Sequence, residues 1–153
     1  MKRLVHLLWL PALLAAAAAA ATISPSPTGD MTGAGRCAEC HPSAYAVWQA
    51  SAHRKANEAL PAERRADPRC TQCHGGNQPS QAGVQCETCH GAGLVYAKTH
   101  VMKDRELSHL VGLLDPKEDS CRRCHNDTTP AIRPYEHSRM WSAITHGREK
   151  ARP

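Results

Sequence analysis

The sequence predicts a mainly α-helical fold in which short helices and long loops wrap around bound groups. Three observations support this expectation. The helical apolar patterns are brief, the 153 residues include 3 tryptophans, 3 tyrosines and no phenylalanine, and all 8 cysteines fall within one recurring pentapeptide. A chain of this size normally buries branched and aromatic side chains to offset the ordering of its backbone. Bound groups must therefore supply most of the core.

The pentapeptide is C-x-x-C-H, and it occurs as CAECH, CTQCH, CETCH and CRRCH. It is the attachment signature of c-type haem, in which two thiols bond to the vinyl groups and the histidine ligates the iron from one face. Structural zinc explains cysteine pairs but not the recurring histidine, and a disulfide scaffold explains no histidine. We therefore predict a small multihaem cytochrome c with four covalently attached haem c groups and their iron. The residues concerned are Cys37, Cys40, Cys70, Cys73, Cys86, Cys89, Cys121 and Cys124, with His41, His74, His90 and His125 as ligands.

The N-terminal residues have the parts of a secretory signal: Lys2 and Arg3, an apolar run, and small residues suited to cleavage. The expected organisation is a signal peptide over 1–21, a flexible leader over 22–35 and a tetrahaem domain over 36–153. An uncleaved membrane anchor is the alternative, since the apolar run is about long enough to span a bilayer. Because c-type cytochromes mature outside the cytoplasmic membrane, we expect a periplasmic protein.

The formal net charge of +5 does not indicate a nucleic-acid partner. Removal of the signal lowers it, and haem propionates add about two negative charges per haem. Arg122 and Arg123 are expected to pair with propionates or to lie on a docking surface. We expect a monomer that binds no nucleic acid and, once the signal is cleaved, no membrane.

Helix-forming patterns occupy the segments between the motifs. Residues 42–60 begin with a proline that suits a first helical turn and continue with many alanines. Tyr45 and Trp48 lie on one stripe of this helix that could face a porphyrin. Residues 61–69 are polar and predict a loop, and the Gly-, Pro- and Gln-rich residues 77–83 predict another.

Two further helices are predicted towards the C-terminus. Residues 104–114 end before an Asp-Pro pair. Their apolar side chains share one helical face, namely Leu107, Leu110, Val111 and Leu114. Residues 135–146 end before Gly147.

Histidines outside the motifs decide what each iron can do. A second imidazole keeps iron low-spin in both oxidation states and suits electron transfer, whereas an open position suits ligand binding or chemistry. Five histidines outside the motifs and the signal could serve: His53, His100, His109, His137 and His146. They are numerous enough to close every site, but need not do so.

Three stretches resemble the tetrahaem cytochrome c-554 family: CAECHPSAYAVWQASAHRKA, GVQCETCHGAGLVYAKTH and CRRCHNDTTPAIRPYEHSRMWSAITH. The resemblance implies that His53, His100 and His146 are distal ligands, with His137 as the alternative to His146. It also implies that glycines after His90 let the backbone turn tightly beside one haem while His100 ligates a different one. The His74 haem would be open on one face, unless His109 or His137 closes it.

The resemblance implies a periplasmic electron carrier rather than an enzyme. Its partners would be periplasmic redox proteins, with a donor like hydroxylamine oxidoreductase as one candidate, and no catalytic residue is assigned. Two alternatives remain. One is a redox enzyme that acts on a small nitrogen species at the His74 haem, and the other is a membrane-anchored tetrahaem quinol dehydrogenase that retains its N-terminal segment.

Overall fold

The computed structural model describes residues 29–76, 82–126 and 134–147. The expectations for the signal peptide, for the leader up to residue 28 and for most of the loop 77–83 lie outside these ranges. Within them the chain is helical, with isolated bridges at Gly76 and no strand. The predicted fold class, mainly α with short helices and long loops, is confirmed. The elements are α1 (Ala34–Ala38), α2 (Pro42–Ala50), η1 (Ala62–Arg64), α3 (Pro68–His74), α4 (Cys86–His90), α5 (Thr99–Met102), α6 (Arg105–Leu110), α7 (Glu118–Arg122) and α8 (His137–Ile144).

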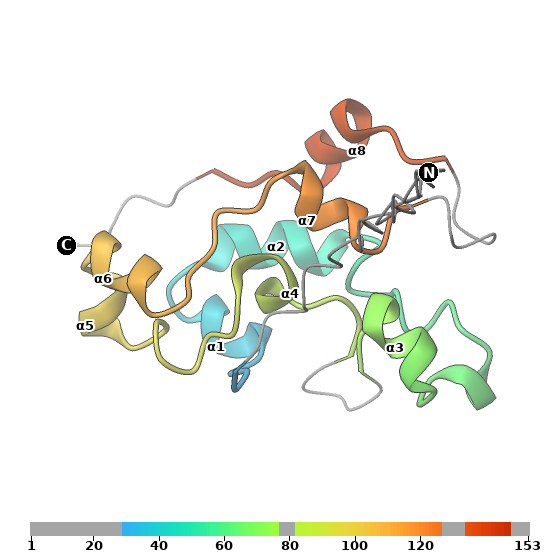
Figure 1. Ribbon diagram of the computed structural model, residues 1–153, viewed down its shortest axis with the longest axis horizontal. Coiled ribbons are helices and arrows are strands. Elements are labelled where there is room, and N and C mark those ends of the chain that lie inside the picture. Colours follow the sequence, from blue (N-terminus) through green and yellow to red (C-terminus); the bar gives the residue numbers. More distant parts are fainter. Residues whose placement is uncertain (1–28, 77–81, 127–133, 148–153) are drawn as a thin grey trace, which may run out of the picture.

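The helices form an elongated arrangement with α4 near its centre (Figure 1). Helices α5 and α6 lie at one end and α3 at the other, while α8 lies beyond α7 on one long side. The third motif, on α4, therefore occupies the middle of the molecule. No helix in the described ranges is long and apolar enough to cross a membrane.

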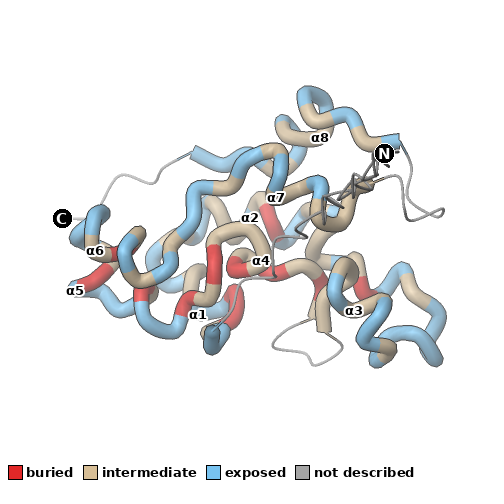
Figure 2. The backbone as a smooth tube through the Cα atoms, in the orientation of Figure 1, coloured by how far each residue is buried: buried red, intermediate tan, exposed pale blue. Residues whose placement is uncertain are grey.

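Few side chains are buried, and they do not form one apolar core (Figure 2). The buried apolar side chains of the described residues are Ala34, Trp48, Tyr96 and Val101, and as many buried side chains are polar: Asn57, Gln85, Glu87 and Ser108. Large apolar side chains stay accessible to solvent, with Leu110 at 81% exposed. The protein part thus leaves apolar surface for bound groups to cover.

Helix α2 is shorter than the predicted 42–60 because its last turn is closed at Trp48. The carbonyl of Trp48 accepts hydrogen bonds from both the backbone N–H (2.9 Å) and the hydroxyl (2.7 Å) of Ser51. Ser51 then adopts extended backbone angles, so the helix ends and turns follow. The Trp48 indole is buried and donates to the carbonyl of Val84 at 2.7 Å, which holds α2 against the segment before α4.

Helix α6 also ends earlier than predicted. It begins where the Asp104 side chain accepts from the backbone N–H of Leu107 at 3.0 Å, and it ends at Leu110 because Gly112 takes a φ of +112°. The apolar face expected over 104–114 is therefore split. Leu114 leaves it and bonds to His90, with Leu114 N–H to His90 C=O at 2.8 Å. Helix α8 agrees with the prediction for 135–146 except at its ends, whereas η1 and the start of α3 replace part of the loop predicted over 61–69.

The small side-chain core generates a test. A variant with all eight cysteines replaced by serine, and so without covalent haem, is expected to show no cooperative thermal transition, because too little apolar surface is buried to offset backbone ordering. Far-ultraviolet circular dichroism during heating measures this. A cooperative melt with helicity near that of the haem-loaded protein would contradict the expectation.

Candidate functional site

Each C-x-x-C-H motif lies on or at the end of a short helix: α1, α3, α4 and α7. In helical geometry, positions three and four apart lie on one face, so the two thiols and the histidine of a motif point to the same side. Helices α1 and α7 end before the histidine of their motif, but the helical hydrogen-bond pattern continues to that histidine. The His41 N–H bonds to the Cys37 carbonyl at 2.8 Å and the His125 N–H to the Cys121 carbonyl at 2.9 Å. The motifs therefore have the local shape that haem c attachment needs.

The second and third motif histidines are held in the tautomer that ligates iron through Nε2. Nδ1 of His74 lies 2.8 Å from the Ala56 carbonyl, and Nδ1 of His90 lies 3.1 Å from the Leu114 carbonyl. A carbonyl only accepts, so Nδ1 carries the proton and Nε2 keeps a free lone pair. Burial lowers the pKa of His90, which also favours the neutral imidazole.

Two motif histidines face a second histidine ring at the separation expected across one metal ion. The ring centres of His53 and His125 are 6.1 Å apart, and those of His90 and His146 are 5.8 Å apart. Two imidazole nitrogens on opposite sides of a metal, each about 2 Å from it, place their ring centres about 6 Å apart. Burial, and next the neighbouring His125, lower the pKa of His53. These residues fit a haem iron with two histidine ligands.

The other histidines have different surroundings. The His137 Nδ1 lies 2.7 Å from the Tyr135 hydroxyl, and its ring lies beside Trp141. Both nitrogens of His109 face protein groups, with Nδ1 2.9 Å from the Leu113 carbonyl and Nε2 3.7 Å from an Asp115 oxygen. This arrangement favours His146 over His137 at the third motif. His100 is exposed on α5, and its role as a ligand stays a prediction.

Sequence reasoning missed Glu87, the residue between Cys86 and Thr88 in the third motif. Its side chain is fully buried (0% exposed). The carboxylate accepts three backbone hydrogen bonds of 2.7 Å, from Thr32, Gly33 and Gly93. The only available signal was an acidic residue inside C-x-x-C-H followed by a Gly-Ala-Gly stretch, and such a position is usually read as a spacer. Glu87 joins the start of α1 to the loop after α4.

The first and third motifs are consequently in contact. The Ala34 N–H donates to Gln85 Oε1 at 3.1 Å, beside the Glu87 bonds. Before haem is attached, the interaction between the Cys37 and Cys86 thiols lowers the pKa of Cys37 and raises that of Cys86. The final residues of the stretch expected as a leader are thus fixed, and α1 begins at Ala34, two residues before the predicted domain start.

The fourth motif contacts both the third and the second. Arg123 Nη2 donates to the Thr88 carbonyl at 2.5 Å, and the Cys124 thiol lies 3.9 Å from the Gln72 carbonyl. Burial and a hydrogen bond with Cys73 raise the pKa of Cys124 to about 12. These contacts order the motifs in space as first, third, fourth and second.

The two arginines of the fourth motif have protein partners in the described residues. Arg122 pairs with Glu118 at 2.5 Å, and its guanidinium lies 5.5 Å from the centre of the Tyr135 ring. Arg123 is anchored on the Thr88 carbonyl. The expectation that they pair with propionates stays a prediction.

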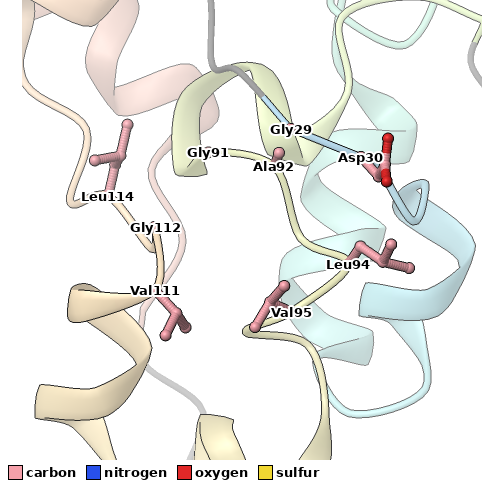
Figure 3. A pocket seen from close by; sticks show the side chains of 9 residues that line it. All are labelled: Gly29, Asp30, Gly91, Ala92, Leu94, Val95, Val111, Gly112 and Leu114. Carbon is pink, nitrogen blue, oxygen red and sulfur yellow. The ribbon is translucent and has the colours of Figure 1, made fainter.

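An apolar cavity of about 510 Å³ opens beside the third motif (Figure 3). Leu94 and Val95 line one side, Val111 and Leu114 line the other, and Gly91 begins the strip of backbone between them. The chain can turn there because Gly91 has a φ of +86°, as predicted for the glycine after His90. An apolar surface one residue beyond a histidine predicted to ligate iron suits contact with a porphyrin.

Comparison with known proteins agrees with this chemistry. A family model described as cytochrome c7 and related cytochrome c matches residues 26–91, a range that contains the first three motifs. No curated protein and no solved structure matches the chain. The motifs and this match identify a multihaem c-type cytochrome with covalently bound, iron-containing haem c. The class implies electron transfer, and the match does not distinguish the narrower c-554 family.

The hydrogen bonds of Glu87 with Thr32, Gly33 and Gly93, here called the Glu87 junction, can be tested with a matched control. A Cβ added at Gly93 would lie 2.7 Å from Glu87 Oε1 and 3.1 Å from Thr32 Cγ2, so Gly93→Ala is expected to destabilise the haem-loaded protein by about 1–3 kcal/mol through overpacking. A Cβ at Gly35, in α1, meets nothing within 4 Å, and Gly35→Ala should be neutral or slightly stabilising. Guanidinium unfolding monitored by haem absorbance measures both. Equal midpoints for the two variants would contradict the role of the junction.

Proposed function

We propose that the protein is a periplasmic tetrahaem electron carrier that passes electrons between redox proteins. The observation that carries the proposal concerns two pairs of imidazole rings, His53 with His125 and His90 with His146. In each pair the ring centres lie at the distance expected for two ligands of one iron. An iron held by two imidazoles stays low-spin when it changes oxidation state, so little rearrangement accompanies electron transfer. The repeated motif supports a count of four haems.

The contacts between motifs support a route for electrons. The residues just before the first motif bond to the third motif, the third bonds to the fourth, and the fourth lies against the second. Haems attached to thiols that lie against one another would be close neighbours. We infer a chain in the order His41, His90, His125 and His74, with the first and second haems at its ends as the places where partners dock.

Location and partners rest on the N-terminal signal and on the resemblance to the cytochrome c-554 family. Both favour periplasmic redox proteins as donor and acceptor, and a hydroxylamine oxidoreductase-like donor is one candidate. The resemblance also gives His100 as a distal ligand and leaves the His74 haem open on one face. Because His125 and His90 already have partners, we infer that His100 ligates the first haem.

The count and the spin states are tested together. Pyridine haemochrome analysis of the purified protein is expected to give four haems per chain. Low-temperature electron paramagnetic resonance of the ferric protein should show three low-spin haems and one high-spin haem. Fewer than four haems, or mainly high-spin iron, would contradict a tetrahaem electron carrier.

The distal assignment at the third haem has its own test. His146→Ala should convert one low-spin haem to high-spin, because it removes the imidazole that faces His90. His137→Ala, at the start of the helix that precedes His146, should leave all spin states unchanged, since His137 faces Tyr135 and Trp141. The opposite result, a new high-spin signal in His137→Ala only, would assign the ligand to His137.

One observation keeps a second function under consideration. His74 is oriented through Nδ1, yet within the described ranges no histidine ring faces it as His146 faces His90. An open iron there would let a small nitrogen species bind, and the protein would then act as a redox enzyme. Titration of the reduced protein with nitric oxide separates the functions. Stoichiometric binding and turnover would favour the enzyme, and unchanged spectra would favour the carrier.

A further inference from the structure

Glu87 is a buried charge that the proposed electron route does not use. Among the described residues it is the only acidic side chain that is buried, and it lies where the first and third motifs meet. We propose that Glu87 lowers the reduction potentials of the His41 and His90 haems, so that electrons collect on the His125 and His74 haems. The inference rests on the proposed electron-carrier function and assigns a direction to it.

Backbone N–H groups surround the Glu87 carboxylate. Both oxygens accept backbone N–H groups, with Oε1 bonded to Thr32 and Gly93 and Oε2 bonded to Gly33. Charge-assisted bonds of this kind stabilise a buried carboxylate, but backbone donors do not neutralise it. None of the ion pairs among the described residues includes Glu87, so a full negative charge stays in the interior.

This charge is placed to act on two haems together. Glu87 lies between the two cysteines of the third motif and bonds to the residues just before α1, which carries Cys37. Its field reaches neighbouring groups, since burial and then the Glu87 charge raise the pKa of Tyr96. In a low-dielectric interior a negative charge stabilises ferric iron, with its extra positive charge, over ferrous iron. The two neighbouring haems therefore become harder to reduce.

A separate observation at the fourth motif acts in the same direction. Nδ1 of His125 is buried and has no hydrogen-bond partner in the described part of the chain, whereas Nδ1 of His90 faces the Leu114 carbonyl. An imidazole that donates from Nδ1 is a more basic ligand and stabilises ferric iron more strongly. The His125 haem lacks this stabilisation and should be reduced before the His90 haem.

The test compares Glu87→Gln with Glu39→Gln. Both variants remove one negative charge from inside a C-x-x-C-H motif, but Glu39 is exposed and paired with Arg36. The haem count and reversible reduction of each protein are established first, and redox titrations are then followed by electron paramagnetic resonance. In Glu87→Gln, two of the four transitions should move to higher potential by at least a tenfold change in the reduction equilibrium constant, about 59 mV for one electron. A shift no larger than in Glu39→Gln, or one spread over all four haems, would overturn the proposal.

If Glu87→Gln does not assemble, the wild-type protein can still contradict the proposal. The signals of the His90 and His125 haems are assigned by their loss in His146→Ala and His53→Ala. On lowering the potential, the His125 signal should disappear before the His90 signal, and the reverse order would overturn the inference about Glu87. Fewer than four haems in the wild-type protein would instead overturn the proposed function, so the two failures are distinguishable.

Discussion

A single buried carboxylate holds together the part of the molecule on which the rest depends. The Glu87 carboxylate accepts hydrogen bonds from backbone N–H groups on both sides of the third motif, from Thr32 and Gly33 on one side and from Gly93 on the other. The cost of burying the charge is offset by these bonds only if all three segments keep their places. The start of α1, helix α4 and the loop after it therefore behave as one unit, and two haem-attachment sites are brought into contact.

Around this unit the chain is held mainly by polar contacts with the backbone. The Trp48 indole and the carbonyl of His53 bind the segment before α4, and the imidazoles of His74 and His90 bind carbonyls far along the chain. Such contacts orient side chains but bury little apolar surface. A protein organised in this way depends on its haems for cohesion, and the haems depend on these contacts for the orientation of their ligands.

The spatial order of the motifs differs from their order in the chain. The fourth motif lies between the third and the second, because Arg123 reaches the Thr88 carbonyl and Cys124 lies against the second motif. An electron moving along neighbouring haems would therefore visit them out of sequence order. Glu87 lies near one end of that route, and Nδ1 of His125, further along, has no hydrogen-bond partner among the residues that the structure describes. These two features would make the halves of the route unequal.

The sequence by itself determined the cofactor chemistry and the helical class, because C-x-x-C-H spacing is a local requirement of haem attachment and short-range apolar patterns report helices directly. It also predicted α2 and α8, and the glycine turn at Gly91, since these depend on neighbouring residues. Helix ends were less accurate where a side chain such as Ser51 competes for the last carbonyls.

Tertiary structure alone decided which histidines face each other, which motifs touch and what Glu87 does. The pairs His53–His125 and His90–His146 join residues more than fifty positions apart, and no local pattern encodes such a pairing. The same holds for Glu87, whose role appears only when Thr32, Gly33 and Gly93 converge on its oxygens. The physical reason is that a buried charge is stable only where distant backbone donors surround it.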